Sequence, residues 1–133
     1  MTGKDTEAGQ ALVLVVEDEP AAAEAIKKLL VRRLGVEVDI AQDLEAAREM
    51  VSSRDYLLIT LDQKLPDGTG LEFLRELKAA RNSTPVVMVS AVDPSSLKED
   101  PVEIGAIDYV IKDEWISSRL IQAARLGLGY ASE

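Results

Sequence analysis

Five residues scattered along the chain have the types that a phosphate or metal site needs: Glu17, Asp18, Asp62, Ser90 and Lys112. Each ends or directly follows an apolar, β-like run. In an open parallel sheet the carboxyl ends of the strands line up along one edge, which is where α/β domains bind ligands. Three carboxylates, a hydroxyl and a lysine gathered there indicate a magnesium site beside an aspartate that can be phosphorylated.

Taken singly, each residue has a plainer explanation. Glu17 and Asp18 suit the start of a helix, Asp62 suits a turn, and a strand-end serine or a surface lysine is commonplace. Together they carry chemistry, because carboxylates at the ends of adjacent strands, about 4.8 Å apart, repel unless a cation neutralises them. Asp62 is then the nucleophile, and Ser90 and Lys112 supply a hydrogen bond and a point charge to a phosphoryl group.

Composition limits the alternatives. The 133 residues include no histidine and no cysteine, which excludes imidazole catalysis and makes a zinc site unfavourable. Any metal must be held by oxygen, which favours magnesium, manganese or calcium. The net charge of −9 argues against direct contact with nucleic acid or an anionic membrane. We expect a cytoplasmic protein.

Short apolar runs alternate with helical patterns, and five such runs read as strands: Ala11–Val16, Val36–Ala41, Tyr56–Leu61, Pro85–Ser90 and Ile107–Ile111. Nearly continuous apolar runs are typical of strands buried on both faces of a parallel sheet. The alternation of strand and helix predicts a doubly wound α/β sandwich.

Helix signals separate these runs. Pro20 suits a first helical position and Gly35 a helix end, Asp43 can cap a second helix, and further helices are expected over Gly70–Ala80 and Glu114–Leu126. The fourth helix is the weak point. It begins well at Asp93, but Pro101 stands where the helix should continue, so we expect it to be short, frayed or bent before Pro101.

At this point the chain resembles the response-regulator receiver domain, the CheY-like phospho-acceptor module of two-component signalling. The similar stretches are Val15 to Pro20, Asp62 to Gly70 with its Leu65-Pro66-Asp67-Gly68 turn, Ser90-Ala91, and Gly105 to Lys112. The resemblance covers about 12–126. It implies a flavodoxin-like sheet of five parallel strands in the order 2-1-3-4-5, flanked by five helices, over 11–127. Residues 1–10 are then a flexible tail and 128–133 a C-terminal tail.

The resemblance also assigns roles around the acceptor. Asp62 accepts a phosphoryl group from a partner's histidine. Magnesium is bound by Asp18, Asp62 and the backbone carbonyl of Lys64, and Glu17 acts through water. The Lys64 side chain flanks the phosphoryl group, and we expect its charge to shield the acyl phosphate from water.

Ser90 and Lys112 are implied to hold the phosphoryl group, and Tyr109 to turn inward when Ser90 moves. This movement remodels the face made by the fourth helix, fifth strand and fifth helix. One departure from the family is Asp113, where the family has proline after the lysine in a cis bond. We expect a trans bond here, because a cis bond before another residue costs about 3–4 kcal/mol.

The implied partners are a sensor histidine kinase or histidine phosphotransfer protein and a downstream protein effector, with a homodimer as a further outcome of phosphorylation. No direct contact with nucleic acid or membrane is expected, nor any enzymatic activity beyond phosphorylation and dephosphorylation of the chain itself. The main alternative is a degenerate receiver that acts as an unphosphorylated scaffold.

Three other classes fit the sequence less well. A haloacid dehalogenase-type hydrolase wants an aspartate where Lys64 stands, and a flavodoxin-type FMN module wants a hydroxyl-rich and glycine-rich loop where Glu17 and Asp18 stand. The stretch from Asp62 to Gly68 also lacks the alternating oxygen ligands of an EF-hand.

Overall fold

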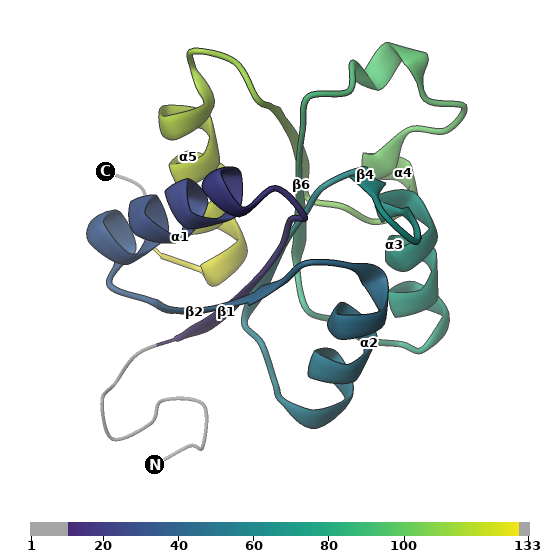
Figure 1. The fold of residues 1–133 in the computed structure, drawn as a ribbon, viewed down its shortest axis with the longest axis horizontal. Coiled ribbons are helices and arrows are strands. Elements are labelled where there is room, and N and C mark those ends of the chain that lie inside the picture. The colour runs from purple at the N-terminus through teal and green to yellow at the C-terminus, as the bar shows by residue number, and fades with distance from the viewer. Residues whose placement is uncertain (1–10, 131–133) are drawn as a thin grey trace.

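A parallel sheet of five strands forms the centre of the molecule (Figure 1). The structure is a computed structural model, which describes residues 11–130. Its strands are β1 (Leu12–Val16), β2 (Glu37–Ala41), β3 (Leu58–Leu61), β6 (Val86–Ser90) and β7 (Asp108–Ile111). Their order is β2-β1-β3-β6-β7, and every neighbouring pair is parallel. This confirms the predicted five-stranded sheet and its 2-1-3-4-5 order.

Helices cover both faces of the sheet. Figure 1 shows α1 (Pro20–Leu34) and α5 (Ile116–Leu128) on one side and α2 (Leu44–Ser53), α3 (Gly70–Ala79) and α4 (Pro101–Ile104) on the other. Helix α1 begins and ends where the sequence predicts, because Pro20 opens it and Gly35 adopts a left-handed φ of 67° directly after it. The side chain of Asp43 accepts from the Ala46 amide and so caps α2 as expected.

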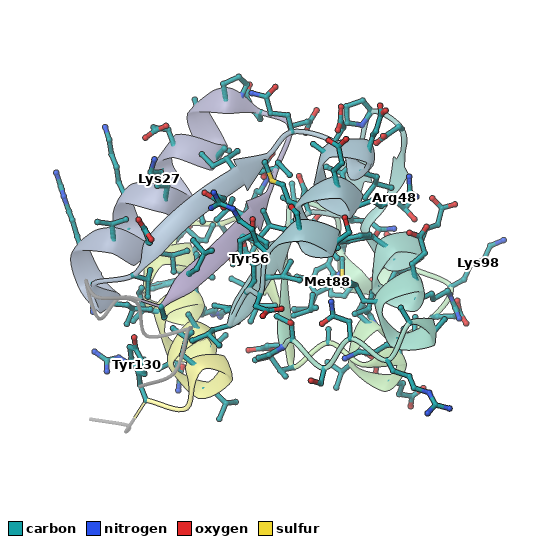
Figure 2. All side chains as sticks on the ribbon, turned by 90° about the horizontal axis from the view of Figure 1, so that it is seen from below. Lys27, Arg48, Tyr56, Met88, Lys98 and Tyr130 are labelled. Atoms are coloured by element: carbon teal, nitrogen blue, oxygen red, sulfur yellow. The ribbon has the colours of Figure 1, made fainter. Side chains whose placement is uncertain are left out.

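The alternation of side chains along each strand divides the interior into two cores. In β1, Val13 and Val15 pack toward α1 and α5, whereas Leu14 and Val16 pack toward α2 and α3. Phe73 and Met88 lie deep in the second core, and Figure 2 shows Met88 between the sheet and α3. Burial on both faces explains why the central strands read as continuous apolar runs.

The fourth helix differs from the prediction, which placed it before Pro101. The segment after β6 forms only a short 3-10 turn (Pro94–Ser96), and α4 begins at Pro101. Pro101 therefore occupies the first helical position, where its missing N–H is no loss. The side chain of Asp100 caps the helix by accepting from the Val102 amide at 3.0 Å. The predicted interruption is real, but the proline starts the helix rather than breaking it.

A small hairpin was not predicted. Strands β4 (Lys64–Leu65) and β5 (Gly68–Thr69) pair antiparallel around Pro66 and Asp67, in the loop between β3 and α3. The hairpin begins at Lys64, directly after the Asp62-Gln63 pair, so in sequence it follows Asp62 closely.

The expected tails are described only in part. Residues 1–10 and 131–133 lie outside the described part of the chain. Leu128, the first residue assigned to the C-terminal tail, is instead the last residue of α5, and Gly129 ends that helix with a φ of 74°. Within residues 11–130, no helix has the length and apolar character needed to cross a membrane.

Candidate phosphoryl and metal site

The sheet itself brings the predicted residues to one edge. Backbone hydrogen bonds continue past the strand ends: the Glu17 amide donates to the Ala41 carbonyl at 2.9 Å, and the Asp62 amide donates to the Val16 carbonyl at 3.1 Å. The Lys112 amide donates to the Ser90 carbonyl at 2.9 Å in the same way. The backbones that carry these side chains are therefore held as firmly as the sheet.

Three carboxylates meet at this edge. Glu17, Asp18 and Asp62 each offer an oxygen, and these oxygens lie within 4.8 Å of one another. Glu17 and Asp62 are buried, with 2% and 7% of their surface exposed, and Asp18 is exposed. An all-oxygen donor set of this size fits a hard divalent cation, and magnesium typically takes one or two carboxylates and fills the remaining positions with water and phosphate oxygens.

Lys112 reaches into the carboxylate cluster. Its Nζ donates to Oε1 of Glu17 at 2.5 Å and to Oδ2 of Asp62 at 3.1 Å. Burial acts to lower the pKa of Lys112, but the hydrogen bonds and charges of the two carboxylates outweigh it and raise the pKa above its usual value. Lys112 is therefore a firmly charged ammonium group next to Asp62.

The substitution of Asp113 for the family's proline does not remove Lys112 from the site. None of the peptide bonds within residues 11–130 is cis, which confirms the expected trans bond between Lys112 and Asp113. The Lys112 side chain nevertheless makes both contacts with Glu17 and Asp62.

Ser90 and Tyr109 meet at the backbone of one residue, Val92. The Val92 amide donates to Oγ of Ser90 at 3.1 Å, and the Tyr109 hydroxyl donates to the Val92 carbonyl at 2.7 Å. Ser90 is fully buried, while the Tyr109 ring is half-buried against the core of Leu14 and Phe73. Burial raises the pKa of the Tyr109 hydroxyl, which keeps it a hydrogen-bond donor.

Sequence reasoning missed Gln63. This buried residue follows Asp62, and its backbone amide donates to Oδ1 of Asp62 at 2.7 Å. Its side-chain Oε1 accepts from the Leu71 amide at 3.0 Å, and its carbonyl accepts from the Gly70 amide at 2.9 Å. A Cβ on Gly70 would overlap the Asp62 carbonyl oxygen, so only glycine fits there. A polar residue directly after a buried strand was the available signal.

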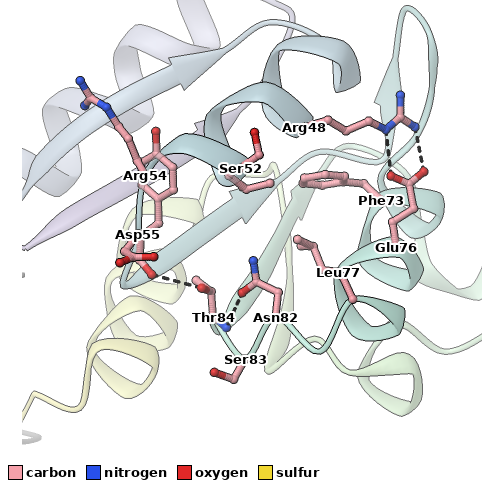
Figure 3. Close-up of a pocket in the computed structure, with 13 residues that line it drawn as sticks. Arg48, Ser52, Arg54, Asp55, Phe73, Glu76, Leu77, Asn82, Ser83 and Thr84 are labelled. Atoms are coloured by element: carbon pink, nitrogen blue, oxygen red, sulfur yellow. Dashed lines mark hydrogen bonds and ion pairs between the residues drawn. The ribbon is translucent and has the colours of Figure 1, made fainter.

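A separate groove of about 520 Å³ lies between α2 and α3 (Figure 3). Arg48 of α2 crosses its rim to Glu76 of α3, with two hydrogen bonds of 2.8 Å. None of the sequence-predicted site residues lines this groove. The carboxylate edge is thus distinct from this hollow in the surface.

A known protein family matches most of this chain. The family model for the response regulator receiver domain matches residues 13–125. The chain belongs to the response regulator receiver family. Receiver domains of this family bind Mg²⁺ at an acidic pocket, and in this chain Glu17, Asp18 and Asp62 form a cluster of carboxylates.

Curated relatives are longer than this receiver chain. The transcriptional regulatory protein DltR of Streptococcus agalactiae is 36% identical over 129 residues, which cover 88% of this chain and 57% of that protein. The transcriptional regulatory protein CutR of Streptomyces coelicolor is 36% identical over 115 residues, covering 86% of this chain and 52% of CutR. The chain spans about half the length of the curated relatives it matches.

Solved receiver structures share the fold over almost their whole length. The receiver domain of NtrX from Brucella abortus is 29% identical with a TM-score of 0.79, covering 90% of this chain and 99% of that one. The Francisella response regulator 1452 receiver domain is 27% identical with a TM-score of 0.79, covering 89% and 97%. These matches agree with the flavodoxin-like topology.

Proposed function

We propose that this receiver domain is a phospho-acceptor switch in which Asp62 takes a phosphoryl group from a histidine of a sensor kinase or histidine phosphotransfer protein. The observation that carries the proposal is the position of Asp62. Its buried carboxylate stands between two further carboxylates and the ammonium of Lys112, at 3.1 Å. This arrangement offers a nucleophile, an oxygen-ligand metal site and a positive charge at one point.

The transfer balances without a general base in this chain. An oxygen of the Asp62 carboxylate forms the new bond to phosphorus, and the P–N bond to the donor imidazole breaks. The leaving imidazole keeps the bonding electron pair and takes up a proton on the donor protein. Lys112 lies close enough to contact an oxygen of the phosphoryl group and balance its spread charge.

The metal site in this proposal consists of Asp18, Asp62 and the backbone carbonyl of Lys64, with Glu17 acting through water. Bound Mg²⁺ would neutralise charge on the phosphoryl oxygens during transfer. The side chain of Lys64 is exposed on β4 beside the site, where its charge can shield the acyl phosphate.

The response runs through Ser90 and Tyr109 to the face formed by α4, β7 and α5. Ser90 can keep accepting from the Val92 amide while its hydroxyl proton turns to a phosphoryl oxygen, since a hydroxyl both donates and accepts. A shift of Ser90 therefore moves Val92, which also holds Tyr109. The changed face would bind a protein effector or a second copy of the chain, and we assign the reaction to the cytoplasm.

Intact mass tests the proposal. After incubation with acetyl phosphate and Mg²⁺, the wild-type chain should gain about 80 Da, the mass of one phosphoryl group. The variant Asp62→Asn and a sample with excess chelator should gain nothing. Phosphorylation of Asp62→Asn at the wild-type rate would show that another residue is the acceptor. A wild-type chain that binds Mg²⁺ but gains no mass, even with a cognate kinase, would favour the scaffold alternative.

A further inference from the structure

The carboxylate of Asp67 joins two elements that are far apart in the sequence. Asp67 lies in the turn between β4 and β5, in the loop that follows Asp62. Its Oδ1 accepts from the Leu44 amide at 2.8 Å, and its Oδ2 accepts from the Glu45 amide at 3.0 Å. Both amides belong to the first turn of α2, and the hydrogen bond from Leu44 lowers the pKa of Asp67.

Helix α2 therefore has two caps from different parts of the chain. Asp43, next to the helix in sequence, accepts only from the Ala46 amide at 2.8 Å. The amides of Leu44 and Glu45 have no carbonyl partner within the helix, as is general for a first turn, and Asp67 supplies both acceptors. Both aspartates thus cap α2 with a carboxylate. Only Asp67 belongs to the loop of residues 63–69 between Asp62 and α3, which we call the acceptor loop.

Hydrogen bonds join the two ends of the acceptor loop, so we expect the loop to move as one body. The Gly70 amide binds the carbonyl of Gln63, and the Leu71 amide binds its side chain, which ties both ends of the loop together. Gly68 has a φ of 154°, and a Cβ there would lie 2.8 Å from Cδ1 of Leu44. The loop thus rests directly on the first residue of α2, and Lys64 is carried on it.

We propose that Asp67 is a positioning residue for the chemistry at Asp62, since its hydrogen bonds to α2 fix the loop that follows Asp62 and carries the Lys64 carbonyl. This inference rests on the proposed function of Asp62 as the phospho-acceptor. Coupling between two sites is reciprocal, so loading the acceptor edge also orders the start of α2. The first turn of α2 then becomes a second responding element beside the α4, β7 and α5 face.

A matched pair of variants separates capping from positioning. Asp67→Ala and Asp43→Ala each remove a cap from α2, and each should lower the melting temperature by about 4 °C. Only Asp67→Ala should weaken Mg²⁺ binding, by about tenfold as for other residues that orient metal ligands, and slow phosphorylation by acetyl phosphate. Asp67→Asn retains one acceptor oxygen and should lie between Asp67→Ala and wild type.

Hydrogen exchange with and without Mg²⁺, compared between Asp67→Ala and Asp43→Ala, supplies a readout that the shared loss of a helix cap does not explain. In wild type, Mg²⁺ should slow exchange of the Leu44 and Glu45 amides, and this slowing should be lost in Asp67→Ala. Equal Mg²⁺ affinities and phosphorylation rates in Asp67→Ala and Asp43→Ala would overturn the inference while leaving the proposed function intact. A wild-type chain that takes up neither Mg²⁺ nor phosphoryl would overturn both.

Discussion

The charge balance around Asp62 depends on individual residues, above all on Glu17 and Lys112. Glu17 is more deeply buried than any other carboxylate in the described part of the chain, and it is held by the ammonium of Lys112 and the Glu19 amide. Burial raises the pKa of Glu17, although the hydrogen bond from Lys112 opposes this. A cation is therefore needed at this edge even without metal, and Lys112 supplies it.

The raised pKa of Glu17 predicts that the stability of the fold depends on pH. Because the pKa of Glu17 is raised in the folded state, the folded chain binds this proton more tightly than the unfolded chain. In metal-free protein the contribution of Glu17 to stability is thus fully present below pH 4.5 and is lost as the pH rises through the raised folded value. Glu17→Gln should remove this loss, so its stability relative to wild type should increase with pH.

Urea unfolding at a series of pH values, with a chelator present, measures this difference. Glu24→Gln is the matched control, because it removes an exposed carboxylate from α1. If the difference in unfolding free energy between Glu17→Gln and wild type stays constant from pH 4 to pH 7, the pKa of Glu17 is not raised in the folded state.

Much of the candidate site could be predicted from residue types and their positions in the sequence. The rest depended on contacts between residues that lie far apart in the sequence. Glu17, Asp62 and Lys112 stand at strand ends, so the sheet order alone brings them together. The contacts of Asp67 with α2 join residues more than 20 positions apart and have no local pattern. A turn aspartate in this position looks the same in sequence whether or not it caps another helix.

At the scale of elements, α4 is the part of the fold that departs most from expectation. Its start is defined by the Asp100 cap and Pro101, and the segment before it is tied to α3 by the ion pair of Arg75 with Glu99. Sequence reasoning weighed Pro101 as an interior residue, because the pattern began at Asp93. The capping aspartate directly before the proline was the signal that a second, separate helix starts there.

The two interpretations of Pro101 predict opposite signs for one substitution. If Pro101 interrupted a helix, Pro101→Ala would stabilise the protein by about 3 kcal/mol. In the observed first-turn position Pro101 is buried and costs no hydrogen bond, so Pro101→Ala should destabilise by about 1 kcal/mol. Urea unfolding measures the sign, and far-UV circular dichroism should show no gain of helix. A stabilised variant with added helix would contradict the observed arrangement.

The other elements were predictable because their signals are repeated along many residues. Strands buried on both faces and helices with capping residues leave patterns that local physics fixes, as in α1 and α3. The ends of α5 differ from the prediction by two residues, which is common where no side chain caps the start. Strands β4 and β5 have only two residues each, too few for any periodicity.

For the molecule as a whole, the edge that carries the three carboxylates and Lys112 links distant parts of the sheet. Glu17 and Asp18 follow β1, Asp62 follows β3 and Lys112 follows β7, so a ligand at this edge contacts residues from three strands of one sheet. The net charge of −9 adds a general repulsion that any salt would relieve. Specific metal binding must therefore be separated from screening.

Magnesium should stabilise the whole fold by binding the folded state alone. At a concentration about 100 times its dissociation constant the gain is about 2.7 kcal/mol, which for a chain of this size raises the melting temperature by about 10 °C. Asp18→Asn removes an exposed ligand of the cluster and should lose most of this rise. Sodium chloride at equal ionic strength and the variant Glu37→Gln, which removes an exposed carboxylate from β2, control for screening. An equal rise in Asp18→Asn and wild type would show that the magnesium lies elsewhere, because only a site that uses Asp18 distinguishes the two chains.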